Sequence, residues 1–336
     1  MQSEDARREL SEAVGRWGPW TAHNIRLADG VFTLGEHIAS PKVRRVLQVV
    51  ADLAGKPLDR LRVLDLACLE AQYAIEFALH GARVTAIEGR QTNIEKARFA
   101  KRILQLDALD LVQGDVRDLH VDRYGQFDVV LCLGILYHLD VPDVFAFLER
   151  IAACSSGLAV FDTYVSLAPK RSYEYKGREY WGRDIQEHTP NEDISARKAK
   201  LWSSIDNAKS VWLTTPTLLN LLTRFGFTSA YECHVPVETG KPLDRVTIVA
   251  IKGRAMALRT CPATNDLAAN ECPEREVRLP SHHQRPLANL RKSATQMVPA
   301  PVRRSLKRAL VSVGVMRPPR EVWRQQTGTD GRAPGE

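Results

Sequence analysis

The sequence predicts an α/β protein with a doubly wound, mostly parallel sheet of seven strands. Between residues 61 and 252, short apolar runs alternate with longer stretches of helical periodicity, which is the pattern of βαβ units. With 336 residues, 44% of them hydrophobic, the chain can bury a full-sized core and still carry appendages. We expect an N-terminal helical arm with a covering segment over residues 1–59, the sheet domain over residues 60–253 and a tail over residues 254–336.

The seven strands are predicted from apolar runs bounded by turn-forming residues. They cover Arg62–Leu66, Arg83–Glu88, Leu109–Gln113, Phe127–Leu131, Leu158–Thr163, Ala230–His234 and Val246–Ile251. No helical pattern separates the last two runs, and Gly240 and Pro242 lie between them. We therefore expect the sheet to end in an antiparallel hairpin.

Helices are predicted where apolar residues recur at helical spacing between these strands. They cover Tyr73–His80, Thr92–Leu104, Val141–Ala153 and Pro216–Phe225. For the last helix we expect Thr215 as the N-cap, Pro216 at the first helical position and Gly226 as the stop. Residues 164–214, which precede this helix, are expected to form a lid insertion.

Acidic residues stand at the ends of three successive strands. Asp65 lies at the end of the first strand, Glu88 ends the second with Gly89 after it, and Asp115 follows the third. The carboxyl ends of parallel strands form the ligand crevice, where an acidic side chain can accept hydrogen bonds from a ribose diol. A single carboxylate at such a place more often caps a helix or lies in a solvated turn. The ordered set favours a binding site for a nucleoside-containing cofactor.

The strand order and the segment Asp65-Leu66-Ala67-Cys68-Leu69-Glu70-Ala71 resemble the class I S-adenosylmethionine-dependent methyltransferases over roughly residues 60–252. The resemblance implies that S-adenosylmethionine is the cofactor and that the protein is a methyltransferase with the Rossmann-like fold of that family. It also implies a cofactor site formed by Asp65, Ala67, Leu69, Glu88, Gly89, Asp115, Val116 and Leu133.

The first loop departs from the family pattern, which is roughly Asp-x-Gly-x-Gly-x-Gly. Ala67, Leu69 and Ala71 stand where the family has glycine. Because a leucine adopts a positive φ angle only with difficulty, we expect the loop to follow a different path. The departure also leaves open a weakened cofactor site or a catalytically silent scaffold.

The fourth strand leads into Leu131-Cys132-Leu133-Gly134-Ile135-Leu136-Tyr137-His138-Leu139. This segment resembles Gly-Val-Leu-Tyr-His in wobble-uridine tRNA carboxymethyltransferases and in many small-molecule methyltransferases. The resemblance implies that Tyr137 and His138 lie near the methyl group. His138 is a candidate base for a hydroxyl proton, with His188 in the lid as its competitor. A histidine that caps or packs at the strand end is the structural alternative.

Aromatic residues are dense in the expected lid. They are Tyr173, Tyr175, Tyr180, Trp181, His188, Trp202 and Trp212, accompanied by polar residues that include Arg183 and Glu187. Such a surface suits an organic acceptor, and we expect Tyr180, Arg183 and Trp202 to contact it. Trp20 and His23 in the N-terminal segment are expected to cover the site as well. The alternatives are a lid that packs on its own aromatic residues and an arm that only anchors to the core.

The charge of the chain is concentrated in its tail. Residues 254–336 contain 15 Lys and Arg against 7 Asp and Glu, and the rest of the chain is nearly neutral. A basic amphipathic segment at residues 301–311 allows weak contact with a membrane surface or with RNA. The chain lacks a long apolar run and its six cysteines are scattered, so we expect a cytoplasmic protein without a transmembrane segment or a metal site.

These observations favour an enzyme that O-methylates a sugar or secondary-metabolite hydroxyl. The alternative is a tRNA wobble-uridine-type modification enzyme or an RNA-binding protein that keeps the fold. A nearly neutral sheet domain argues against an RNA groove, because phosphate contacts need clustered Lys and Arg. We also expect the tail to be dispensable for chemistry.

Overall fold

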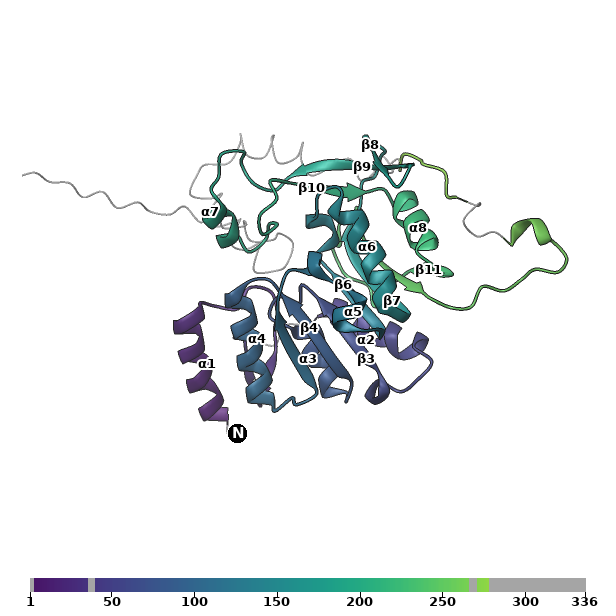
Figure 1. Cartoon of the computed structure of the whole chain (residues 1–336). Coiled ribbons are helices and arrows are strands. Elements are labelled where there is room, and N and C mark those ends of the chain that lie inside the picture. The colour runs from purple at the N-terminus through teal and green to yellow at the C-terminus, as the bar shows by residue number, and fades with distance from the viewer. Residues whose placement is uncertain (1–2, 36–39, 266–270, 278–336) are drawn as a thin grey trace, which may run out of the picture. The chain divides into compact units, whose positions relative to one another are not determined.

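The computed structural model describes residues 3–35, 40–265 and 271–277 (Figure 1). The compact unit that contains the sheet ends at Val277, beyond the predicted boundary at residue 253. The rest of the predicted tail, including the basic segment at residues 301–311, lies outside the described residues.

The main sheet has seven strands, and their order in the sheet differs from their order in the sequence. In spatial order they are β11 (Ser229–Glu232), β12 (Arg245–Ile251), β7 (Ser155–Tyr164), β6 (Phe127–Leu133), β3 (Arg62–Leu66), β4 (Arg83–Glu88) and β5 (Leu109–Gln113). Strand β12 pairs antiparallel with both β7 and β11, whereas β3 to β7 pair in parallel. The predicted sheet and its antiparallel end are therefore confirmed.

Helices cover both faces of this sheet. They are α1 (Ser3–Trp17), α2 (Pro41–Leu53), α3 (Gln72–Leu79), α4 (Gln91–Leu104), α5 (Val121–Tyr124), α6 (Asp143–Cys154) and α8 (Thr215–Arg224). Successive side chains of a strand point to opposite faces. In β3, Val63 accordingly packs in the apolar cluster that contains α1 to α4 residues, and Leu64 packs in the cluster of α6 and α8. This arrangement is the doubly wound fold that the sequence predicts.

The start of α8 differs from the prediction by one residue. The hydroxyl of Thr214, and not that of Thr215, accepts the cap hydrogen bond, from the Thr217 amide at 3.2 Å. Thr215 is therefore already helical, and Pro216 occupies the second position of the helix. Proline is accepted there because a first-turn amide has no partner within the helix.

Two further parts adjoin the main sheet. The N-terminal arm adds a short hairpin, β1 (Arg26–Ala28) with β2 (Val31–Phe32), between α1 and α2. The predicted insertion forms an antiparallel sheet of β8 (Arg171–Tyr175), β9 (Arg178–Gln186) and β10 (Lys209–Leu213), with α7 (Ile194–Ala199) between β9 and β10. Figure 1 shows this lid sheet lying across one end of the main sheet.

Candidate active site

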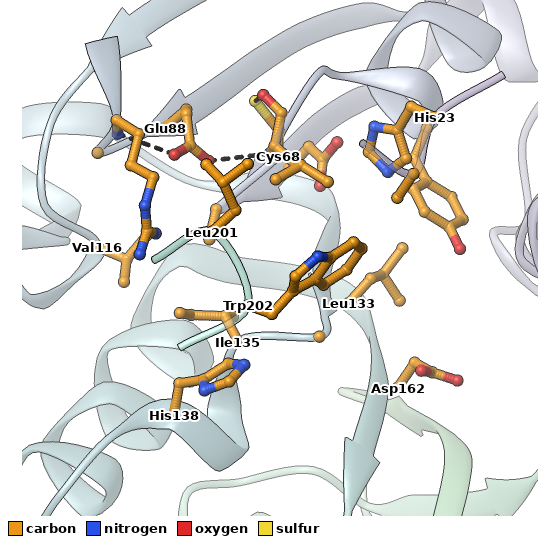
Figure 2. Close-up of a pocket in the computed structure, with 18 of the residues that line it drawn as sticks. His23, Cys68, Glu88, Val116, Leu133, Ile135, His138, Asp162, Leu201 and Trp202 are labelled. Atoms are coloured by element: carbon orange, nitrogen blue, oxygen red, sulfur yellow. Dashed lines mark hydrogen bonds between the residues drawn. The ribbon is translucent and has the colours of Figure 1, made fainter. Parts of the chain in front are cut away.

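A cavity of about 380 Å³ lies at the carboxyl ends of β3, β4, β5 and β6. The lid segment from Leu201 to Ile205 closes one side of it, and Ala22 and His23 of the N-terminal arm line another. Figure 2 shows the labelled side chains converging on this space, with Trp202 of the lid between Glu88 and Asp162. All eight predicted cofactor residues line the cavity: Asp65, Ala67, Leu69, Glu88, Gly89, Asp115, Val116 and Leu133.

The loop after β3 has positive φ angles at the three positions where the family has glycine. The angles are 52° at Ala67, 53° at Leu69 and 64° at Ala71. The expectation that Leu69 avoids a positive φ angle is therefore wrong: the chain adopts the left-handed conformation without glycine, at a cost of roughly 1–2 kcal/mol per residue. Backbone hydrogen bonds hold it there, from the Cys68 amide to Ile87 (3.0 Å) and from the Ala71 amide to Cys68 (2.8 Å).

Glu88 is fixed at the end of β4 by three donors. Its carboxylate accepts hydrogen bonds from the Leu69 amide (2.9 Å), the Arg90 amide (2.8 Å) and the Asn93 side chain (3.2 Å). Burial raises the pKa of this carboxyl, and the three donors oppose the shift. Two oxygens offer about four acceptor positions, and three are taken, so about one position remains for a ligand hydroxyl.

Asp65 is buried and lacks part of its hydrogen bonding. Its Oδ2 atom has no hydrogen-bond partner among the described residues. Burial, opposed in part by the Ala74 amide and aided by the charge of Glu88, raises the pKa of Asp65 to about 7. An unsatisfied buried acceptor at a cavity wall is the place where a ligand cation or donor is expected.

Asp115 connects the sheet to the lid through Arg117. Its Oδ1 atom accepts a hydrogen bond from the Arg117 amide at 2.8 Å, and the guanidinium pairs with both Asp115 and Asp206 of the lid at 2.6 Å. Burial would raise the pKa of Asp115, but the bonds from Arg117 outweigh it and lower the pKa. Asp115 thus caps a 3₁₀ turn and anchors the lid while it lines the cavity.

The lid approaches the end of β4 closely. Arg90 donates to the carbonyls of Lys200 (2.7 Å) and Ser203 (2.9 Å). A Cβ atom at Gly89 would lie only 2.5 Å from the Ile205 side chain. A side chain at residue 89 would therefore require the Ile205 side chain of the lid to move.

His138 faces the cavity and is held by a buried carboxylate. Its Nδ1 atom lies 2.9 Å from Oε1 of Glu187, whose side chain is only 7% exposed. Glu187 also accepts from the Ser210 hydroxyl (2.7 Å) and the Ser204 amide (3.1 Å). Burial tends to raise the pKa of Glu187, but the bond from His138 and the other donors lower it. An ionised Glu187 fixes the tautomer with a proton on Nδ1, which leaves Nε2 as the basic nitrogen.

Glu70 ties the N-terminal segment to the loop. Its carboxylate, which is fully buried, accepts hydrogen bonds from the amides of Thr21 (2.7 Å), Ala22 (3.3 Å) and His23 (3.2 Å). Lys96, also buried, lies 3.5 Å from the same carboxylate. His23 accepts from the Gln72 amide through Nδ1 (3.2 Å), and burial lowers its pKa to about 4. His23 therefore meets the cavity as a neutral imidazole.

Several predicted residues lie elsewhere in the structure. His188 is buried and bonded to the Ser204 carbonyl at 2.9 Å, and it does not line the cavity. Tyr180 packs on Phe145, with ring centroids 5.3 Å apart. Arg183 stacks on Trp212 at 4.4 Å. Trp20 packs on Phe99 at 5.7 Å, so of the five predicted substrate contacts only His23 and Trp202 reach the cavity.

Other cavity residues were not predicted from the sequence. They include Lys42, Gln72, Tyr73, Asp162 and Arg245, together with Glu70 behind the wall. Asp162 lies inside the fifth predicted strand, and a charged residue in an apolar run is a signal that could have found it. Lys42 and Arg245 carry no such signal, because exposed basic residues are common.

The described part of the chain shows neither a membrane-spanning helix nor a metal site. None of its helices is long and apolar enough to span a membrane. No group of three or more His, Cys, Asp or Glu residues there is arranged to hold a metal ion. Four of the six cysteines are buried free thiols, and Cys261 and Cys272 are exposed.

Comparison with known proteins agrees with this geometry. Residues 63–156 match the family model described as a methyltransferase domain. The ubiquinone biosynthesis O-methyltransferase of Rickettsia akari is 25% identical over 209 residues, which cover 57% of this chain and 81% of the relative. Its counterpart from Vibrio atlanticus is 27% identical over 207 residues, covering 60% of this chain and 78% of the relative.

A solved structure shares the fold. The N-terminal domain of EvdMO1, crystallised in the presence of SAH and D-fucose, matches with a TM-score of 0.58 and 21% identity, over 75% of this chain and 99% of that domain. The seven-stranded sheet with its antiparallel β12, the cavity at its carboxyl edge and the matched methyltransferase domain lead to one conclusion. Residues 63–156 lie in a methyltransferase domain, and the fold and the relatives support a class I S-adenosylmethionine-dependent methyltransferase.

Proposed function

We propose that the protein methylates a hydroxyl oxygen of a small organic acceptor, such as a sugar or a secondary metabolite. The observation that carries this proposal is the pair of His138 and Glu187, which presents a basic nitrogen to the same cavity that holds Asp65 and Glu88. The relatives named O-methyltransferases support oxygen as the methylated atom. The proposal retains the cytoplasmic location that the sequence favours.

In this proposal the strand-end residues hold the cofactor. Glu88 accepts a hydrogen bond from a ribose hydroxyl at its remaining acceptor position, and Asp115 and Val116 border the adenine. Asp65 receives the ammonium group of the methionine part, which satisfies its unpaired oxygen. When it is bound, S-adenosylmethionine supplies a methyl group that its sulfonium has already activated. Leu69 and Leu133, which line the cavity, supply apolar contacts to the cofactor.

The chain's own contribution to the chemical step is positioning and one proton transfer. An acceptor hydroxyl next to His138 would give its proton to Nε2, and its oxygen would keep the electron pair that forms the new bond to the methyl carbon. The carbon–sulfur bond would break at the same time, with its electron pair left on sulfur. Glu187 stabilises the imidazolium that results. Trp202 and Ile205 of the lid, together with the N-terminal arm, narrow the access of water to this region.

The alternative of RNA modification has less support. It depends on basic residues of the tail, most of which lie outside the described residues. In the described part, the cavity is bounded by the lid and the arm and has the size of a small-molecule site.

Cofactor binding tests the proposal through Glu88. We expect Glu88→Ala to weaken the binding of S-adenosylhomocysteine by about 1.5–3 kcal/mol, the usual loss for hydrogen bonds to a charged group. Titration calorimetry measures this change. Asp110→Ala is a matched control, because Asp110 is exposed on the neighbouring strand β5 and does not line the cavity. Equal affinities for the wild type and Glu88→Ala would refute the ribose assignment.

A further inference from the structure

One wall of the cavity carries an excess of positive charge. We call it the cationic wall, formed by Lys42, Arg45, Lys241 and Arg245. Lys42 and Arg245 line the cavity itself. Arg45 lies behind them with a side chain only 1% exposed, and Lys241 is partly buried beside it. The four residues come from α2, the loop before β12, and β12.

The carboxylates in contact with these cations are too few to balance them. Among the described residues, only Asp162 and Glu238 form ion pairs with the cationic wall. Asp162 is already engaged by Nε of Arg245 at 2.6 Å and by the Thr247 hydroxyl at 2.9 Å. Four positive groups thus face two negative ones.

The ammonium of Lys42 has carboxylates nearby but no hydrogen bond to either of them. It lies 3.9 Å from Asp162 and 3.6 Å from Glu238, which are distances of ion pairs and not of hydrogen bonds. Its side chain is 28% exposed and lines the cavity, so its hydrogen atoms remain available to a ligand. Burial, with a contribution from the charge of Arg45, lowers the pKa of Lys241, as expected where cations crowd together.

Arg245 is held rigidly next to the proposed base. Its guanidinium lies 4.9 Å from the ring of Tyr164 and 5.7 Å from that of Tyr137. Tyr164 is stacked on Trp212 at 4.6 Å, and Tyr137 lies 4.3 Å from the ring of His138. The cationic wall therefore borders the region where the acceptor hydroxyl is expected. In Figure 2, Asp162 and Glu88 lie on opposite sides of Trp202.

We propose that the cationic wall binds a carboxylate or phosphate group of the acceptor, so that the substrate is an anionic hydroxylated molecule. This inference rests on the proposed function. A fixed Arg245 and an incompletely paired Lys42 can bind such a group by charge-assisted hydrogen bonds without rearrangement of the wall. A neutral acceptor would leave the excess positive charge uncompensated within a partly desolvated site.

Simple anions test the wall without a known acceptor. The protein is saturated with S-adenosylhomocysteine, and its thermal stability is measured with sodium phosphate, sodium acetate or sodium chloride at equal ionic strength. We expect phosphate or acetate to stabilise the complex more than chloride does, because a ligand that binds the folded state raises its stability. The same thermal measurement is then made with glucose 6-phosphate, glucuronate and glucose. The compound that stabilises the complex most shows whether the wall prefers a phosphate or a carboxylate.

Variants locate the effect. Lys42→Met should lower the affinity for the anion that the wild type prefers by at least about fivefold, the loss expected for a charged hydrogen bond. Lys42→Arg should retain most of the affinity. Lys56→Met is the matched control, because Lys56 pairs with Asp128 at 2.6 Å and does not line the cavity.

Three results would overturn the inference. The first is that phosphate and acetate stabilise the wild-type complex no more than chloride does. The second is an equal anion affinity in Lys42→Met. The third is a Lys42→Met protein that binds S-adenosylhomocysteine weakly but 5′-methylthioadenosine normally, which would assign the wall to the carboxylate of the cofactor. If the wild type binds no S-adenosylhomocysteine at all, the proposed function fails and the inference fails with it.

Discussion

Single carboxyl groups at the strand ends differ in what they can bind because their surroundings differ. Glu88 accepts three hydrogen bonds from the protein, and Asp115 is paired with Arg117. Asp65 instead keeps one oxygen without a partner among the described residues, and its pKa is raised to about 7. Asp65 is therefore expected to change its charge near neutral pH in response to a ligand.

Cofactor binding should release a proton from Asp65. Burial raises the pKa of its carboxyl from 3.8 to about 7, so the folded protein holds this proton at pH 6. An ammonium group beside Asp65 favours the carboxylate, and the proton leaves on binding. Affinity for S-adenosylhomocysteine should therefore rise with pH up to about 7. Calorimetry at pH 6 in buffers of different ionisation enthalpy measures the release.

The raised pKa of Asp65 also makes the free energy of unfolding depend on pH. Because the folded pKa is above the unfolded value, the contribution of Asp65 to stability is fully present below pH 3.8 and is lost as the pH rises through about 7. Asp65→Asn should abolish the proton release and remove this pH dependence. An identical release in Asp65→Asn would show that another group titrates.

Some site residues could be predicted from their position in the sequence, and others could not. Asp65, Glu88 and Asp115 follow from where the apolar strands end. The pairing of His138 with Glu187 depends on how β9 and β10 fold back over the sheet, which no local pattern encodes. His188, next in sequence to Glu187, is buried on the Ser204 carbonyl and does not line the cavity.

At the scale of elements, the loop after β3 is left-handed at three positions although none of them is glycine. The left-handed conformation of Ala67, with φ of 52°, is strained for any residue with a Cβ atom. The loop stays in place because the sheet and Glu88 hold its amides, as the bond from Leu69 to Glu88 shows. The steric rule for single residues was sound, but tertiary hydrogen bonds overrode it.

Replacing Ala67 by glycine should therefore stabilise the protein. We expect Ala67→Gly to raise the free energy of unfolding by about 0.5–1 kcal/mol, because relief of strain exceeds the added entropy of the unfolded chain. Ala51→Gly, in an exposed position of helix α2, should lower it by a similar amount. Urea denaturation measures both. A loss of stability in Ala67→Gly would mean that the loop is not strained.

The elements of the sheet were easier to predict than those of the lid. Runs such as Phe127–Leu133 are apolar on both faces because helices cover both sides. The lid strands β8, β9 and β10 mix aromatic and charged residues, since they pack only partly against the domain. Their pattern gives no clear period, so the sequence predicted a lid but not its strands.

At the scale of the whole molecule, the domain extends past the predicted boundary. The hydroxyls of Thr214 and Thr217, both buried, donate to Glu274 at 2.9 Å. The Cys272 amide donates to Asn220 at 2.8 Å, and the Val277 amide to the Leu167 carbonyl at 2.8 Å. Residues 271–277 therefore complete the surface of α8 and the lid.

Truncation distinguishes the two boundaries. A protein that ends at Val277 should keep the thermal stability and cofactor affinity of the full chain. A protein that ends at Gly253 should be less stable by about 2 kcal/mol, because buried hydroxyls lose their acceptor. Calorimetric melting measures both, with the full chain as reference. Equal melting temperatures for the two truncated proteins would place the boundary at residue 253, as the sequence predicts.

Proton transfer from a hydroxyl acceptor to His138 is tested most directly by the rate of methyl transfer. This rate is measured from labelled S-adenosylmethionine to a hydroxylated acceptor found in a screen, for the wild type and for His138→Ala. We predict a loss of at least about 100-fold in His138→Ala, with an unchanged affinity for S-adenosylhomocysteine. Glu187→Gln, which keeps the contact with His138 but not its charge, should cause a smaller loss and shift the pH profile of the rate. A near-normal rate in His138→Ala, or a label found on nitrogen or carbon, would contradict the account.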